Sequence, residues 1–297
     1  MQTNIQTAIF PEFVEIIKPV NVSSVPQRSP FRYPGGKTWF VPTFRKWIAS
    51  LERKPKLLVE PFAGGGIISL TALFEDCVDR VLMVELDDEI AAVWKVIVNG
   101  DFQWLADEIV AFKLSKEAAI ERLKLSSSNN KEKAFQTILK NRTFHGGILA
   151  NGSGFLKYGE NGKGILSRWY PKTLAKRLKD LSKIYQRIDF KQDDGIKTLE
   201  ALSNKKDTIF FIDPPYTAGG KKAGRRLYNH FELDHKNLFA VCKKLKGDFL
   251  ITYDNADEVK IMAKDNNFDF RLIPMKNTHH AEMKELVIGK DLSWMDN

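Results

Sequence analysis

The segment FFIDPPY (210–216) joins an apolar run to an acid, two prolines and a tyrosine. Two consecutive prolines cannot donate to a β-ladder, so the run is expected to be a buried strand that stops at Asp213. The exocyclic amine of adenine or cytosine is a poor nucleophile, because its lone pair is delocalised into the ring. Two acceptors that hold both of its N–H bonds would favour the tetrahedral nitrogen from which a methyl group can be attacked.

Each residue of this tetrapeptide can take a part in such a reaction. Asp213 would supply a carboxylate, and Pro214 would supply a backbone carbonyl whose direction is restricted by Pro215. Tyr216 would offer a flat face for a base pulled out of the duplex. A rigid strand-to-loop turn with a polar exit residue is the plainer alternative. This chemistry needs no metal, and the five histidines and two cysteines have no ligand spacing.

A glycine turn, VEPFAGGG (59–66), follows another apolar run and is typical of a ligand site at the end of a strand. Glu85 follows Gly64 by 21 residues and could accept hydrogen bonds from both ribose hydroxyls of an adenosine. The dinucleotide fingerprint would need glycine where Ser69 stands, and Glu60 would repel a pyrophosphate but suits a cation. The turn therefore favours S-adenosylmethionine over a dinucleotide, with glycines that serve only strand–helix packing as the alternative.

The elements that must position these residues alternate between strands and helices. Strands are expected at 57–60, 81–85, 188–192, 208–213 and 248–253, and a terminal antiparallel hairpin at 271–275 and 284–290. This alternation predicts an α/β fold with a doubly wound, Rossmann-like sheet. It is interrupted by a mainly helical insert, so we expect an N-terminal extension (1–28), a catalytic domain (29–100 plus 188–297) and an inserted target-recognition domain (101–187).

The charge of the chain is concentrated in the insert. The net charge is +9, and residues 131–187 hold 13 Lys and Arg against three acids. A confined basic surface favours a polyanion, and nucleic acid is the usual one. A second basic segment, GGKKAGRRLYNHF (219–231), directly follows the DPPY tetrapeptide and could clamp a duplex; the alternative is a solvated loop. The predicted DNA contacts are Arg142, Lys157, Arg168, Lys221, Lys222, Arg225 and Arg226, while Trp169 could wedge into the stack or belong to the core.

Together, RYPGGK (32–37), the glycine turn, the insert and DPPY resemble the Dam-like family of S-adenosylmethionine-dependent DNA adenine methyltransferases, over residues 30–290. Their order is that of the alpha group of amino-methyltransferases, and NRTFHGG (141–147) resembles part of the family's recognition domain. The resemblance assigns Asp213, Pro214 and Tyr216 to the target base and Glu85, often Asp in the family, to the ribose. Asp194, with Asp193 as its rival, would meet the adenine of the cofactor. The remaining cofactor residues that it implies are Tyr33, Lys37, Glu60, Phe62, Gly64 and Gly66, beside Asp213.

The sequence therefore predicts a site-specific DNA methyltransferase that acts on the N6 amine of a flipped adenine in double-stranded DNA. Cytosine N4 methylation and a non-catalytic DNA-binding protein of the same fold are the alternatives. We expect a cytoplasmic protein without membrane contact, in a bacterial or phage-infected cell. It would be either a solitary methylase or the partner of a restriction endonuclease with which it forms no stable complex. The sequence indicates neither the recognised DNA word nor the oligomeric state.

Overall fold

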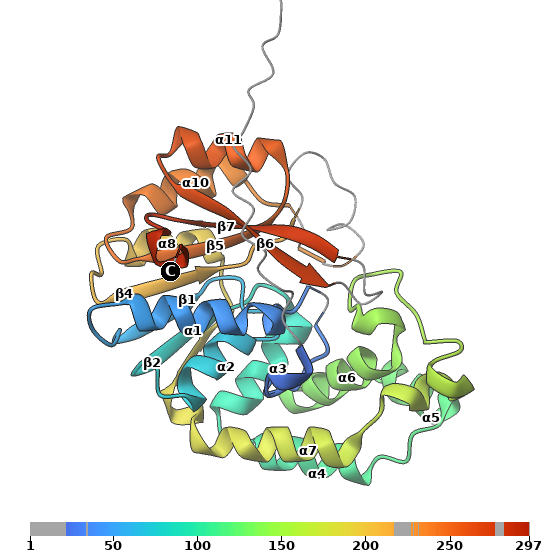
Figure 1. Cartoon of the computed structure of the whole chain (residues 1–297). Helices are drawn as coiled ribbons and strands as arrows, with labels where there is room; N and C mark the ends of the chain where they lie inside the picture. The colour runs from blue at the N-terminus through green and yellow to red at the C-terminus, as the bar shows by residue number, and fades with distance from the viewer. Residues whose placement is uncertain are drawn as a thin grey trace, which may run out of the picture.

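A seven-stranded mixed sheet organises the computed structural model, which describes residues 22–33, 35–216, 227, 229–230, 232–276 and 282–296 (Figure 1). The strand order is β3-β2-β1-β4-β5-β7-β6; the first five are parallel, and β7 runs antiparallel to both β5 and β6. This confirms the α/β prediction and the hairpin at the sheet edge. The strands are β1 (Leu57–Glu60), β2 (Arg80–Val84), β3 (Ile188–Lys191), β4 (Thr208–Ile212), β5 (Phe249–Asp254), β6 (Asp269–Lys276) and β7 (Glu282–Gly289).

Helices cover both faces of the sheet because successive strand residues alternate between two apolar clusters. Leu58 and Phe211 belong to the cluster that packs on one side, and their neighbours Val59 and Phe210 to the cluster on the other. The first cluster includes buried residues of α1 (Val41–Ser50), α2 (Ile67–Phe74) and α3 (Asp88–Val98). The second includes those of α8 (Gly195–Leu202), α10 (His235–Lys244) and α11 (Asp257–Asp265).

The insert is helical, as predicted, and its helices extend the first apolar cluster. They are α4 (Phe102–Ala111), α5 (Lys116–Lys124), α6 (Asn130–Thr143) and α7 (Pro171–Asp180). In Figure 1 they lie below the sheet, with α6 against α3 and α4 against α7. Trp169 is buried, and its ring meets that of Phe112 edge-on at 6.0 Å. Trp169 is therefore a core residue and not a surface wedge. The division into domains stays a prediction.

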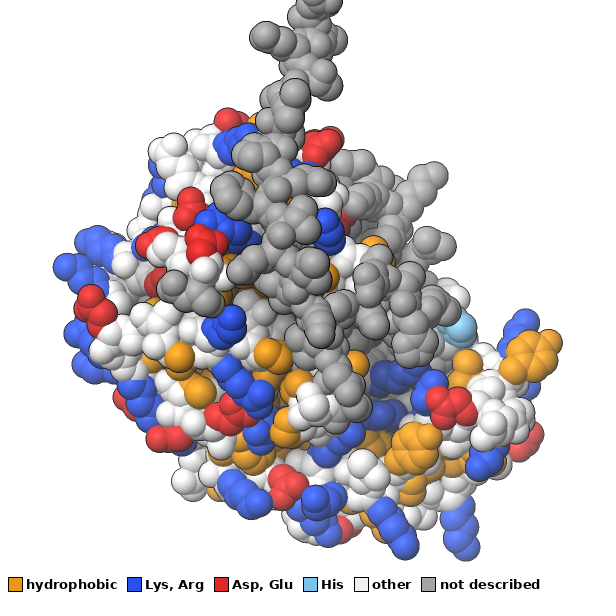
Figure 2. Space-filling model, viewed as in Figure 1, with side chains coloured by type: hydrophobic (Ala, Val, Ile, Leu, Met, Phe, Trp, Pro, Cys, Tyr) orange, Lys and Arg blue, Asp and Glu red, His pale blue; other side chains and the backbone are white. Residues whose placement is uncertain are grey.

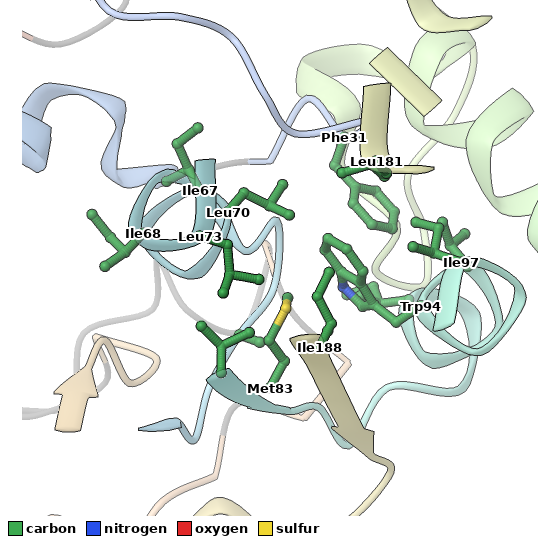
Figure 3. Close-up of a cluster of buried hydrophobic side chains, with 14 of the residues drawn as sticks. Phe31, Ile67, Ile68, Leu70, Leu73, Met83, Trp94, Ile97, Leu181 and Ile188 are labelled. Carbon is green, nitrogen blue, oxygen red and sulfur yellow. The ribbon is translucent and has the colours of Figure 1, made fainter. Parts of the chain in front are cut away.

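The segment that precedes the sheet connects the catalytic half to the insert. Val25 is buried, and Arg28 pairs with Glu75 at 3.0 Å. The ring of Phe31 lies 5.9 Å from the ring of Trp94 on α3. Phe31 and Leu181, which follows α7, belong to the same apolar cluster (Figure 3). Residues 28–33 are thus part of the packed core. Residues 1–21 of the predicted extension lie outside the described residues.

No helix in the described parts of the chain is long and apolar enough to cross a membrane. Those same residues contain no cluster of three or more His, Cys, Asp or Glu side chains that could bind a metal ion.

Candidate active site

One pocket collects the predicted residues at the carboxyl ends of β1, β2 and β4, the edge where α/β sheets bind ligands. Every predicted cofactor residue except Gly64 lines this pocket, and so does Pro215, whereas Pro214 and Tyr216 do not. Residues that are more than a hundred positions apart in the chain are brought together here. The members of the predicted set that line the pocket are Tyr33, Lys37, Glu60, Phe62, Gly66, Glu85, Asp194 and Asp213.

The carboxylate of Asp213 is fixed through one of its two oxygens. Oδ1 lies 2.9 Å from Nζ of Lys37 and accepts hydrogen bonds from the hydroxyls of Tyr216, at 3.0 Å, and Thr252, at 2.8 Å. Among the described residues no donor contacts Oδ2, which is not one of the buried unsatisfied atoms. Because Asp213 lines the pocket, Oδ2 is available to accept a hydrogen bond from a ligand.

A second carboxylate completes the group around Lys37. Oε2 of Glu285, on β7, lies 3.7 Å from Nζ of Lys37 and 3.0 Å from the Tyr216 hydroxyl, whose single proton is shared between this carboxylate and Asp213 Oδ1. Burial opposes the charge of Lys37, which is 4% exposed, yet Asp213 and Glu285 together raise its pKa above the usual range. Burial likewise raises the pKa of Glu285. The buried lysine therefore holds two half-buried acids at the reactive end of the pocket.

Thr252 and Glu285 are functional candidates that the sequence reasoning missed. Thr252 is fully buried in β5, in the run FLITYD, and Glu285 lies in the run KELVIGK. Thr252 is a fully buried polar residue after an apolar run, which is a signal that could have identified it, whereas Glu285 lies next to Lys284 in a strand with other charged residues and gives no such signal.

The ring of Tyr216 is already in contact with other side chains. Nζ of Lys37 lies over it at 4.9 Å from the centroid, and the ring of Tyr253 stacks on it at 5.5 Å. Burial and then the charges of Asp213 and Glu285 hold its pKa well above the ordinary tyrosine value, so the hydroxyl remains a donor. Stacking of a flipped base on Tyr216, as predicted, therefore requires this ring to be uncovered.

Gly64 does not line the pocket, but its backbone conformation shapes the glycine turn. Its backbone is left-handed, with φ of 46°, and a Cβ at this position would lie 2.6 Å from Cε1 of Tyr33. Its carbonyl accepts a hydrogen bond of 2.9 Å from the indole of Trp94. The predicted glycine requirement is thus explained by the close approach of the Tyr33 ring.

The acids Glu60 and Glu85 stand at the ends of β1 and β2. Oε2 of Glu60 accepts from the backbone and hydroxyl of Ser69, at 3.1 and 2.5 Å, and burial raises the pKa of Glu60 to about 8. Glu85 accepts from the backbone amides of Gly64 at 3.0 Å, Leu86 at 2.9 Å and Asp87 at 3.0 Å. Burial raises the pKa of Glu85 to about 7.

Asp194 and its rival Asp193 both line the pocket. Asp194 is the N-cap of α8, where its Oδ1 accepts from the amides of Ile196 at 2.8 Å and Lys197 at 3.0 Å. Asp193 accepts from the amide of Asp194 at 2.8 Å. Their placement beside the glycine turn fits the predicted contact with a cofactor adenine, which stays a prediction for either residue.

The predicted DNA contacts are placed unequally. Lys157 is exposed, and Arg168 is half-buried and paired with Glu160. Arg142 is 7% exposed, and its Nη2 donates to the carbonyl of Pro30 at 2.6 Å, so its guanidinium lies inside and not on the open surface that a direct DNA contact would need. Lys221, Lys222, Arg225 and Arg226 lie outside the described residues.

The insert and the region after DPPY also reach the pocket, which the sequence did not predict. Leu149 of the insert lines it, as does Asn229. The Asn229 amide donates to Oδ2 of Asp87 at 2.7 Å, and its Oδ1 accepts from the backbone of Asn151 at 3.0 Å. Asn229 thus links the cofactor side of the pocket to the insert.

The side chains of the pocket fit S-adenosylmethionine. Its lining includes the acids Asp87, Asp193, Asp194 and Asp213, beside Glu60 and Glu85 with their raised pKa values, against the cations Arg32 and Lys37. A ligand with an ammonium and a sulfonium is attracted by this balance, whereas a pyrophosphate would be repelled. The ends of β1 and β2 also offer the carboxylates that ribose hydroxyls need.

Residues 33–280 match the family model of the D12 class N6 adenine-specific DNA methyltransferases, and the chain belongs to that family. It is an enzyme that uses S-adenosylmethionine to methylate adenine in DNA, which decides against the cytosine and non-catalytic alternatives. The search of curated proteins returned no significant match.

Solved structures with a similar outline are distant in sequence. The rRNA methyltransferase aviRa from Streptomyces viridochromogenes is 13% identical, with 92% of this chain and 93% of that chain covered and a TM-score of 0.42. A putative RNA methyltransferase, PH1948 from Pyrococcus horikoshii, is 9% identical, with 87% and 85% covered and a TM-score of 0.41.

Proposed function

We propose that this D12 class enzyme works in the manner of the Dam-like group: it flips the target adenine out of the duplex and holds its N6 amine between Asp213 and Pro214. The observation that carries this proposal is the unequal use of the two Asp213 oxygens. Oδ1 is taken by Lys37, Tyr216 and Thr252, and Oδ2 of this pocket-lining residue has no partner among the described residues. An acceptor prepared in this way requires no rearrangement when the amine arrives.

Bound S-adenosylmethionine supplies the methyl group and leaves as S-adenosylhomocysteine. In the proposed reaction Asp213 Oδ2 accepts one N6 hydrogen, and the carbonyl of Pro214 accepts the other. The two hydrogen bonds localise the lone pair on N6 and aim it at the methyl carbon for in-line attack. After transfer the nitrogen carries a surplus proton, and Asp213 Oδ2 is the acceptor placed to receive it.

The support for DNA binding is the insert, whose exposed basic residues include Lys157 beside Tyr158, which is 82% exposed. We infer that the insert contacts the duplex and that the basic segment 219–231 contacts it next to the target base. A cognate restriction endonuclease that forms no stable complex, or a solitary role, stays a prediction of the sequence, as does a cytoplasmic location.

The test is methyl transfer by Asp213→Asn, which keeps the shape of the side chain but removes its charge and turns one oxygen into a donor. We expect turnover on unmethylated duplex DNA to fall by about a thousandfold or more, since an essential transition-state acceptor is lost. Binding of S-adenosylhomocysteine should persist and serves as the control for folding. Turnover close to that of the wild type would refute the proposed hold on N6. Long-read sequencing of DNA from a methylase-free host that expresses the protein would identify the methylated base and its sequence context.

A further inference from the structure

Four arginines from distant parts of the sequence gather where the insert meets residues 28–33. We call them the arginine cluster: Arg32, Arg142 at the end of α6, Arg168 in the turn Gly164–Arg168, and Arg177 on α7. Burial, and after it the charges of the three other members, lowers the pKa of Arg142 to about 9. Burial and the charge of Arg168 lower the pKa of Arg32 in the same way. The like charges are therefore within electrostatic reach of one another.

The cluster has far fewer acceptors than donors. Arg168 pairs with Glu160, Arg177 donates to the carbonyl of Ser29 at 3.2 Å, and Arg142 donates to that of Pro30 at 2.6 Å. In the described part of the chain, the Nε atoms of Arg142 and Arg168 are buried without a hydrogen-bond partner. A buried N–H donor without an acceptor is costly, so these two Nε atoms and the four like charges around them favour a bound anion.

Arginines elsewhere in the molecule are arranged differently. Arg80 makes a two-pronged contact with Asp189 at 2.7 and 3.0 Å, and Arg271 contacts Asp296 at 3.0 and 3.2 Å. Each of these guanidiniums has its own carboxylate. Arg28 and Arg122 also have a buried Nε without a partner, but each pairs with a carboxylate. What distinguishes the cluster, among the described residues, is that Arg142 and Arg177 have only backbone carbonyls as acceptors.

The cluster adjoins the pocket in which adenine must be held. Arg32 lines that pocket, together with Ser29, and the segment between them supplies carbonyl partners to the cluster. Figure 2 shows Lys and Arg side chains over the insert at the lower right, as well as along the left edge of the molecule. An anion in the cluster would thus be held close to the target nucleotide.

We propose that the arginine cluster binds one backbone phosphate of the DNA next to the target adenine. A phosphodiester has one negative charge and two acceptor oxygens that match the planar fork of arginine, and it comes with the substrate of the family. Arg32, Arg168 and Arg177, which are partly exposed, contact this phosphate, and the buried Arg142 contributes its charge from the interior. The inference deepens the proposed function, because it places the DNA that the pocket acts on.

The experiment compares Arg177→Gln with Arg80→Gln, which removes the same charge at the amino end of β2, on the opposite edge of the sheet from the pocket. DNA affinity is measured without cofactor across a range of salt concentrations. We expect Arg177→Gln to weaken binding about tenfold and to reduce the slope of log K against log salt by about 0.9, the value for one phosphate contact. Arg80→Gln should change neither quantity.

Equal behaviour of the two variants would overturn the proposal. Arg177→Lys keeps the positive charge but loses the planar guanidinium, so it should retain the salt dependence of DNA binding while losing part of the affinity. A reduced salt slope in this variant would also count against the site. A second probe is inorganic phosphate at constant ionic strength, which should raise the melting temperature of the wild type more than that of Arg177→Gln. Stabilisation by phosphate without any change in the DNA salt slope would assign the cluster to a free anion and refute the DNA phosphate.

These measurements involve no turnover, so they separate this proposal from the proposed function. A protein that binds DNA through the cluster but transfers no methyl group would contradict the proposed function alone. A protein that transfers methyl with an unchanged salt slope in Arg177→Gln would contradict the phosphate site alone.

Discussion

Two carboxylates at opposite ends of the pocket are held in different ways. Glu85, on the cofactor side, is fixed by backbone amides of Gly64, Leu86 and Asp87. Asp213, on the reactive side, is fixed by the side chains of Lys37, Tyr216 and Thr252. Backbone donors stay in place when side chains change, whereas each side-chain donor can be lost to one substitution. The reactive end should therefore be the more fragile half of the site.

The largest expected effect tests that fragility directly. Lys37→Met leaves the half-buried acids Asp213 and Glu285 without their shared cation. We expect kcat to fall by about a hundredfold or more, and the free energy of unfolding to fall by about 3 kcal/mol, as for a broken buried ion pair. Steady-state kinetics and chemical denaturation measure the two quantities.

A second substitution sharpens the same test. Glu285→Gln in the Lys37→Met background removes one of the two unpaired charges, so it should restore part of the lost stability without restoring kcat. If Lys37→Met had the stability and turnover of the wild type, the reactive end would not depend on its side-chain partners as argued.

The next effect is the pH dependence of the affinity for S-adenosylmethionine. Because burial raises the pKa of Glu60 to about 8, the ionised form that a cationic ligand prefers is scarce at neutral pH. Affinity for S-adenosylmethionine should rise about tenfold between pH 6 and 7.5, below the range in which the α-amino group of the ligand loses its proton. Calorimetric titration at several pH values measures this rise, and Glu60→Gln should reduce it.

Protein stability should move in the opposite direction over the same range. The folded-state pKa of Glu60 lies above its unfolded value, so its contribution to stability is complete below about pH 4.5 and is lost as the pH rises toward 8. Glu60→Gln should flatten this decline in the free energy of unfolding. A pH dependence of affinity and stability that is identical in the variant and the wild type would place the titrating group elsewhere.

A smaller effect separates backbone strain from contact at the glycine turn. Gly64→Ala adds a Cβ at a left-handed position against the Tyr33 ring, whereas Gly152→Ala adds one at φ of 85° with nothing within 4 Å. Both substitutions force an alanine into a left-handed conformation, but only Gly64→Ala displaces the Tyr33 ring. We expect its cofactor affinity to fall roughly fivefold, the equivalent of about 1 kcal/mol.

Gly152→Ala should bind the cofactor as the wild type does. Equal losses in the two variants would mean that the Tyr33 contact contributes nothing to the cofactor site.

The parts of the site that could be predicted from sequence are those built by neighbours in the chain. The glycine turn, Glu60 and Glu85 are arranged by the ends of β1 and β2, and DPPY by the end of β4, so short motifs were enough to find them. The α/β class of the core and its antiparallel edge hairpin likewise followed from the alternation of strands and helices. Local pattern is informative wherever the backbone itself makes the geometry.

The rest depends on packing between distant segments, which no single motif records. Glu285 reaches Lys37 only because β7 inserts between β5 and β6, and the register of that hairpin is not readable from its residues. Arg142 looked like a surface cation, yet α6 packs against α3 and turns it inward toward Pro30. Charge in a sequence indicates a binding partner more reliably than it indicates which side chain touches it.

The smallest effect isolates a single member of the reactive-end network. Thr252→Val keeps the shape of the side chain but removes the hydroxyl that donates to Asp213 Oδ1 at 2.8 Å. Lys37 and Tyr216 still hold that oxygen, so the carboxylate should lose orientation and not charge, and kcat should fall about threefold with KM nearly unchanged. Single-turnover rates would measure this, with Thr137→Val, at a buried threonine of α6 whose hydroxyl donates within its own helix, as the matched control. A loss as large as that of Lys37→Met would show that the three donors act as one unit, and that orientation of Oδ2 matters as much as the charge beside it.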